Sequence, residues 1–108
     1  MSESVPSVSL VAMVTAAGDG IGKATAHAFA AAGYDLVLVD LNEQSVHETA
    51  AALRGSPVEV VVADVTDEVA VSALMTRTIE RFGRLDVLAN VVGGSRPVPY
   101  TSASKTSK

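Results

Sequence analysis

The sequence predicts an α/β domain in which helices cover both faces of a parallel sheet, and two observations support this class. Short, continuous apolar runs alternate with segments whose apolar residues recur at helical spacing. That alternation is typical of buried parallel strands joined by right-handed crossovers. Hydrophobic residues make up 48% of the 108 residues and aromatic residues only 4%, as expected for Ala-, Val- and Leu-rich strands buried on both faces.

Four apolar runs are expected to be strands: residues 7–15, 34–40, 58–64 and 85–92. A glycine-rich turn ends the first run, and an acid ends each of the next two, Asp40 and Asp64. Residues 1–7, which precede the first strand, are polar and contain a proline, so we expect a flexible lead. Residues 95–108 are rich in serine and lack an apolar period, so we expect a disordered polar tail.

The three segments between these runs are expected to be amphipathic helices. The first has Ile21, Ala24, Ala28 and Ala31 at helical spacing, and Gly33 is its expected stop.

Asn42 is the expected cap of the second helix, which should run to about Arg54 and bury Val46, Ala50 and Leu53. Either Thr66 or Asp67 can cap the third, which should end at Gly83. Its apolar stripe is expected to comprise Val71, Leu74, Met75, Ile79 and Phe82.

Composition and charge argue against several classes of function. The net charge of −4 and the lack of a basic cluster argue against nucleic acid as a partner. The chain has no cysteine, which excludes disulfides and thiolate chemistry, and its two histidines are too far apart in sequence to suggest a metal site. The apolar run at 8–17 is too short to span a membrane and has no positive charge before it, so a cytoplasmic protein without a membrane partner is expected.

The stretch "TAAGDGIG" (residues 15–22) lies between the first strand and the first helix. A dinucleotide pyrophosphate needs backbone N–H groups at a helix N-terminus and no side chains in its way. Gly20 would let the backbone approach the pyrophosphate, and Gly22 would allow helix and strand to pack closely. The alternative is a tight turn that binds nothing.

Asp40 follows the second strand, 18 positions beyond Gly22 (40 − 22), near the spacing of the dinucleotide-binding fingerprint. Its carboxylate could accept hydrogen bonds from the adenosine ribose and would repel a 2′-phosphate. No arginine adjoins it, and Asp19 adds negative charge, so NAD is expected in preference to NADP. The alternative is that Asp40 only caps a helix.

Two further polar residues lie at predicted strand ends, where ligands bind in parallel sheets. Asp64 could accept a hydrogen bond from the adenine amino group with Val65 packed nearby, or could be a plain surface acid. Asn90 lies among apolar residues and should be hydrogen-bonded if buried. It could tie the fourth strand to its neighbour, face the cofactor, or do both.

Together these motifs resemble the classical short-chain dehydrogenases/reductases. The family's T-G-x-x-x-G-x-G loop corresponds to "TAAGDGIG", its acid after the second strand to "LVLVD", its D-V pair to "ADVTD", and its N-N-A-G region to "FGRLDVLANVVGG". The resemblance spans residues 8–94 and implies part of a Rossmann fold that binds NAD, with strand order 3-2-1-4. The implied cofactor-binding residues are Thr15, Ala16, Gly18, Asp19, Gly20, Ile21, Gly22, Asp40, Leu41, Asp64, Val65 and Asn90.

The sequence departs from the family pattern at several points. Ala16 replaces the first loop glycine, which would cost about 1–2 kcal/mol if that position needs a positive φ. Val91 and Val92 replace the second Asn and the Ala of N-N-A-G. "YTSASK", from Tyr100 to Lys105, places its lysine one position too late for the family's Tyr-x-x-x-Lys pair.

The resemblance implies hydride transfer between a nicotinamide cofactor and an alcohol or carbonyl substrate. We assign no catalytic residue, because the family's catalytic Ser and Tyr-x-x-x-Lys lie beyond the matched region, and we expect a catalytically incomplete chain. A non-enzymatic nucleotide-binding or regulatory module is the alternative. A methyltransferase-like sheet fits less well, since Met13-Val14-Thr15 stands where that class usually has an acid. The free edge of the fourth strand is expected to promote self-association.

Overall fold

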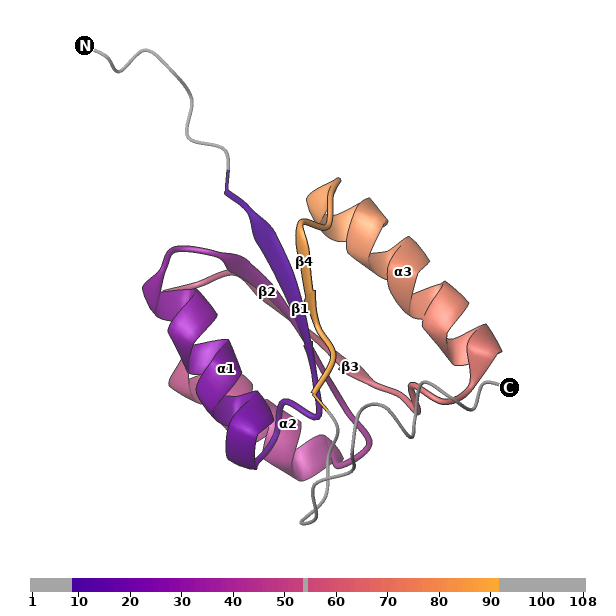
Figure 1. Cartoon of the computed structure of the whole chain (residues 1–108), viewed down its shortest axis with the longest axis horizontal. Helices are drawn as coiled ribbons and strands as arrows, with labels where there is room; N and C mark the ends of the chain where they lie inside the picture. The colour runs from indigo at the N-terminus through magenta and orange to yellow at the C-terminus, as the bar shows by residue number, and fades with distance from the viewer. Residues whose placement is uncertain (1–8, 54, 92–108) are drawn as a thin grey trace, which may run out of the picture.

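The computed structural model describes residues 9–53 and 55–91, which form an alternating series of strands and helices (Figure 1). The expected N-terminal lead, the polar tail and the Tyr100–Lys105 stretch lie outside these residues. The elements are β1 (Val11–Thr15), α1 (Gly20–Ala31), β2 (Asp35–Asp40), α2 (Glu43–Ala52), β3 (Val58–Val62), α3 (Glu68–Phe82) and β4 (Val87–Ala89).

The four strands form one parallel sheet in the order β3-β2-β1-β4, which confirms the predicted topology. In the centre of the sheet, Val14 of β1 pairs with Leu38 of β2 on one side and with Ala89 of β4 on the other. Because all strands run the same way, their carboxyl ends meet at one edge of the sheet.

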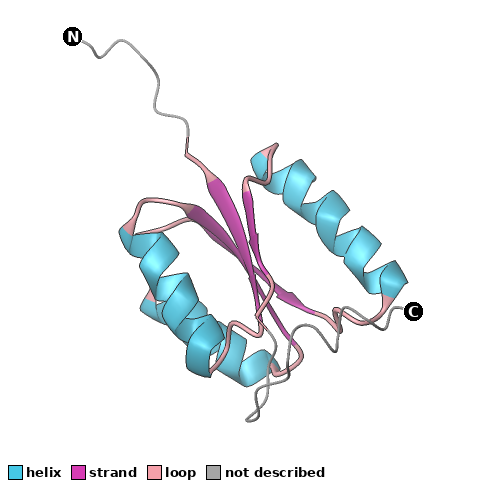
Figure 2. Cartoon of the chain, in the orientation of Figure 1, coloured by secondary structure: helices cyan, strands magenta, loops and turns pink. Residues whose placement is uncertain are grey.

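Helices lie on both faces of the sheet, α1 and α2 on one and α3 on the other (Figure 2). Side chains alternate between two cores, as the pleat of a strand requires. The core under α1 and α2 contains Ala12, Val14, Leu36, Leu38, Ala26, Val46 and Leu53. The core under α3 contains Val11, Met13, Val37, Val39, Val61 and Leu74.

The apolar spacing of α1 does not mark its buried side, although the helix itself is confirmed. Ile21 is 74% exposed, and Ala24, Ala28 and Ala31 are exposed as well. Gly22 and Ala26 are buried instead, and Phe29 packs against the core. In an alanine-rich helix the apolar periodicity does not select a face, and here the close contact at Gly22 determines the buried side.

The expected face of α2 is confirmed, since Val46 and Leu53 are buried and Ala50 packs against them. In α3, Leu74 is buried as expected, but Ile79 is 52% exposed. Thr78 takes a buried place because its hydroxyl donates to the Leu74 carbonyl at 2.9 Å, which satisfies the polar group inside the helix.

The helix ends follow the expected chemistry. Asn42 caps α2 by accepting a hydrogen bond from the Ser45 N–H. Asp67, rather than Thr66, caps α3, because its carboxylate accepts from Val69 N–H at 2.9 Å. Gly83 ends α3 in a left-handed conformation with a φ of 80°.

All four strands are shorter than expected, and β1 begins only at Val11 and β2 at Asp35. β3 stops at Val62, so Asp64 lies in the turn after the strand, and β4 spans only Val87–Ala89, so Asn90 follows it. Within the described residues, β4 pairs only with β1, over three positions. Among the helices of these residues, none has both the length and the apolar character of a membrane span.

Candidate functional site

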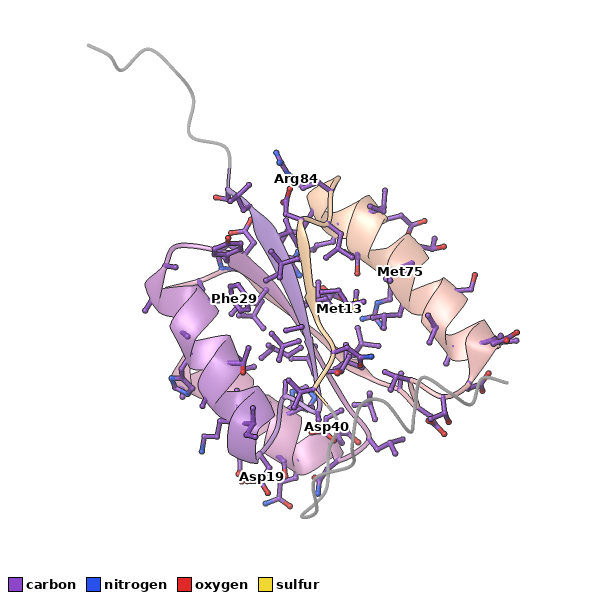
Figure 3. All side chains as sticks on the ribbon, in the orientation of Figure 1. Met13, Asp19, Phe29, Asp40, Met75 and Arg84 are labelled. Carbon is purple, nitrogen blue, oxygen red and sulfur yellow. The ribbon has the colours of Figure 1, made fainter. Side chains whose placement is uncertain are left out.

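The carboxyl ends of the strands enclose a cleft of about 470 Å³. Figure 3 shows Asp19 and Asp40 at this end of the molecule and Arg84 at the opposite end. Residues from all four strand ends line the cleft: Ala16, Asp40, Leu41, Ala63, Asp64, Val65, Thr66, Asn90 and Val91. The cleft therefore occupies the edge at which parallel α/β sheets bind ligands.

The loop from β1 to α1 turns sharply at Ala16, which has a φ of 53°. The next N–H, of Ala17, donates to the Val39 carbonyl at 3.0 Å and ties the loop to β2. Gly22 lies against the turn so closely that a Cβ on it would come 1.9 Å from the Ala16 carbonyl oxygen. The loop thereby brings the N-terminus of α1 against the end of β1.

The first turn of α1 faces solvent at this end of the molecule. Asp19 caps the helix, and its carboxylate accepts from Gly20 N–H at 2.8 Å. Gly20 has a φ of 54°, a conformation that glycine adopts without strain. The exposed Ile21 follows it. Gly20 N–H and Lys23 N–H both donate to Asp19. Ile21 and Gly22 therefore supply the N–H groups of this turn that can donate to an anion.

Asp40 bridges the glycine loop and the start of α2. One carboxylate oxygen, Oδ2, accepts from Gly18 N–H at 2.8 Å, and the other, Oδ1, accepts from Asn42 N–H at 3.1 Å. Asn42 is the cap of α2, so the alternative in which Asp40 itself caps that helix is wrong. The carboxylate stands at the cleft beside the exposed Leu41.

Asp64 forms the wall of the cleft beyond β3. Its Oδ1 accepts from the Thr66 hydroxyl at 2.6 Å and from the Thr66 N–H at 2.9 Å. These two hydrogen bonds lower the pKa of the exposed Asp64 carboxyl below its ordinary value. Val65, which is 39% exposed, offers an apolar surface beside it.

Asn90 and Thr15 join β4 to β1 at the floor of the cleft. The buried Thr15 hydroxyl lies 3.1 Å from Asn90 Oδ1 and 3.0 Å from the Val91 carbonyl oxygen, so it can donate to either. Asn90 thus ties the end of β4 to β1, and it also lines the cleft. The expectation that it lies buried within the strand is wrong: it is solvent-exposed and follows β4.

The structure brings six of the expected site residues to the cleft: Ala16, Asp40, Leu41, Asp64, Val65 and Asn90. Thr15 lies beneath it, Gly18 and Gly22 shape the loop, and Asp19, Gly20 and Ile21 begin α1. The lining residues that the sequence reasoning missed are Ala63, Thr66 and Val91. Thr66 could have been found, because an aspartate followed two residues later by threonine often forms such a turn.

Comparisons with known proteins agree with this geometry. The family model for short chain dehydrogenase matches residues 10–107. Among curated relatives, the short-chain reductase protein NovJ of Streptomyces niveus is 46% identical over 88 residues, an alignment that covers 80% of this chain and 34% of NovJ. The chain therefore spans about a third of the length of this relative.

Two solved structures superpose on the chain. A short chain dehydrogenase/reductase from Burkholderia phymatum, in complex with NAD, is 38% identical with a TM-score of 0.72 over 74% of this chain and 29% of that one. YwfH, an NADPH-dependent reductase involved in bacilysin biosynthesis, is 27% identical with a TM-score of 0.76 over 86% of this chain and 41% of that one. From its matched family model, its relatives and its fold, this chain belongs to the short-chain dehydrogenase family.

Proposed function

We propose that the cleft binds the adenosine half of NAD and that residues 8–94 form the dinucleotide-binding unit of an oxidoreductase. The observation that carries the proposal is the position of the Asp40 carboxylate. It stands at the cleft between the glycine loop and the turn at Asp64. A carboxylate there can accept hydrogen bonds from the two hydroxyls of the adenosine ribose.

The backbone around the loop fits a pyrophosphate. Neither Gly18 nor Gly22 has room for a side chain: a Cβ on Gly18 would lie 2.6 Å from the Ser45 Cβ, and one on Gly22 would meet the Ala16 carbonyl. Around Gly20, by contrast, nothing lies within 4 Å of where a Cβ would be. The exposed first turn of α1 would donate N–H hydrogen bonds to the phosphates.

The adenine would lie toward the end of β3. The Asp64 carboxylate keeps Oδ2 free of any described hydrogen bond while Oδ1 is held by Thr66, so it can accept from the adenine amino group. Leu41 and Val65 present apolar side chains to the same cleft. A base packed between such side chains, with its amino group bonded to a carboxylate, is held in one orientation.

Charge at the ribose end favours NAD over NADP. A 2′-phosphate would bring negative charge beside Asp40, and the residues that follow, Leu41, Asn42 and Glu43, supply no cation. The solved relatives include both an NAD complex and an NADPH-dependent reductase, so family membership alone does not decide the cofactor. The local charge of this chain carries the preference.

Calorimetric titration of the chain with NAD, NADP and S-adenosylmethionine tests the proposal. We expect NAD to bind at least about tenfold more tightly than NADP, since one charged hydrogen bond contributes roughly 1.5–3 kcal/mol and tenfold corresponds to 1.4. Asp40→Ala should weaken NAD by a similar factor, whereas Glu43→Ala, which removes a nearby carboxylate outside the cleft, should not. Equal affinity for NADP, or binding of S-adenosylmethionine, would contradict the assignment.

For the whole protein we propose hydride transfer between the nicotinamide and an alcohol or carbonyl substrate. Support comes from the family alone, because we assign no catalytic group among the described residues. The test is the absorbance of reduced nicotinamide when the chain is incubated with NAD and a panel of alcohols. We expect NAD binding without turnover, because the chain is expected to be catalytically incomplete, whereas turnover would support hydride transfer and contradict that incompleteness.

A further inference from the structure

The contacts of Asp40 within the chain suggest a role beyond recognition of the ribose. We propose that Asp40 is also a positioning residue that holds the glycine loop in the conformation that receives the pyrophosphate. This inference rests on the proposed NAD site and deepens it: the residue that selects the ribose would also organise the phosphate-binding end of the same cleft.

The hydrogen-bonding capacity of the carboxylate is divided evenly. A carboxylate offers about four lone-pair sites. Gly18 N–H takes one on Oδ2 at 2.8 Å, and Asn42 N–H takes one on Oδ1 at 3.1 Å. One site on each oxygen is left, which matches the two hydroxyl donors of a ribose. Cofactor binding therefore does not require Asp40 to release the loop.

The Asp40 carboxylate is anchored on two sides, by the sheet and by α2. The Asp40 main chain pairs with Val62 of β3, and its carbonyl accepts from Ala63 N–H at 3.2 Å. Asn42 is fixed as the cap of α2, since its Oδ1 accepts from Ser45 N–H at 3.0 Å. The carboxylate is therefore held by the sheet and by α2, and the loop is held by the carboxylate.

The loop approaches so closely that only glycine fits at position 18. A Cβ there would lie 2.9 Å from Asp40 Oδ2 and 2.6 Å from the Ser45 Cβ. Gly18 is two residues before Gly20, where α1 begins, so the contact at Gly18 determines where the first N–H groups of α1 point. Loss of the carboxylate should let this part of the loop move away from α2.

Charge alone predicts the opposite effect on an anion. If Asp40 acted only through its charge, its removal would take a negative group away from the phosphates and strengthen their binding. If Asp40 positions the loop, its removal weakens phosphate binding, because preorganised N–H donors are lost. The sign of the change therefore separates the two roles.

The first experiment measures amide hydrogen exchange by NMR on the full chain, without nucleotide. In Asp40→Ala we expect Gly18 N–H to exchange at least about tenfold faster than in the wild type, as expected for the loss of one charged hydrogen bond. Ala17 N–H, which donates to Val39, is the internal control and should keep its protection. Unchanged exchange at Gly18 would overturn the positioning role.

Asp40→Asn is a second, more conservative variant that tests the same inference if Asp40→Ala does not fold. The amide has nearly the same shape and keeps one acceptor oxygen, but its NH₂ group must face either Gly18 N–H or Asn42 N–H. One of these two amides should therefore lose its protection in Asp40→Asn while the other keeps it. Full protection of both amides would contradict the inference.

The second experiment titrates inorganic pyrophosphate and adenosine separately. Pyrophosphate has no ribose hydroxyls, so an effect of Asp40 on its binding does not come from recognition of the ribose. We expect Asp40→Ala to weaken both ligands, and pyrophosphate by at least about threefold. Tighter pyrophosphate binding in Asp40→Ala would show that only the charge of Asp40 matters. If the wild type binds neither ligand, the proposed function fails, whereas the exchange at Gly18 still decides whether Asp40 holds the loop.

Discussion

Replacing Ala16 by glycine should stabilise the protein, because Ala16 has a left-handed backbone with a φ of 53°. A non-glycine residue in this conformation costs about 1–2 kcal/mol, since its Cβ crowds the neighbouring carbonyl oxygen. Glycine removes that strain, but its greater conformational entropy in the unfolded chain lowers stability by about 0.4–1 kcal/mol. The difference leaves a net stabilisation of roughly 0.8 kcal/mol for Ala16→Gly.

Thermal unfolding followed by circular dichroism measures this gain. For a domain of this size, roughly 0.8 kcal/mol corresponds to a rise in Tm of about 3–6 °C. Ala17→Gly is the matched control, because Ala17 is fully buried and its φ is not positive. The same chemical change there should lower stability by about 1–2 kcal/mol, through a lost buried methyl and a more flexible unfolded chain. If Ala16→Gly destabilised the protein as much as Ala17→Gly, the strain assigned to Ala16 would be wrong.

Three other changes test separate parts of the structure. Gly22→Ala should unfold much of the protein, because its Cβ would come 1.9 Å from a backbone oxygen. Gly20→Ala, which has open space around it but a φ of 54°, should lower stability by only about 1 kcal/mol, and urea unfolding compares the two variants. Burial would raise the pKa of Glu59, but its hydrogen bonds to Arg77 and Arg81 outweigh that effect and lower it below 4.5. Stability should therefore fall as the pH drops below 4.5, and Glu59→Gln should make that acid-induced loss shallower in unfolding curves; an unchanged slope would contradict this. Leu88 of the edge strand β4 is 48% exposed, so Leu88→Lys should reduce self-association in sedimentation experiments, and a monomeric wild type would refute the expected association.

The order and type of the elements could be predicted because each rests on a local signal. Continuous apolar runs such as 34–40 indicate strands wherever they lie, and Asn42 caps α2 by a contact only three residues away. The strand order followed from the family resemblance and is confirmed.

What could not be predicted depends on contacts between distant residues. Ile79 satisfies the apolar spacing of α3 yet is half exposed, while Thr78 is buried, because packing against distant strands of the sheet decides which side of α3 is covered. The contact of Gly18 with Asp40 joins residues that are 22 positions apart, and the sequence around neither residue predicts it. The cleft likewise includes Asn90 because Thr15 holds the end of β4 against β1.

The unusual alanine in the loop is tolerated because the two crowded positions of the turn differ in what crowds them. At position 16 the strain comes from the side chain of Ala16 itself, so its cost is limited to the local torsion. At position 22 the neighbour is the carbonyl oxygen of residue 16, which every amino acid carries. A glycine at position 16 would therefore not make room for a side chain at position 22. The close packing of α1 on β1 requires Gly22 whichever residue precedes it, whereas the loop can keep its shape with Ala16.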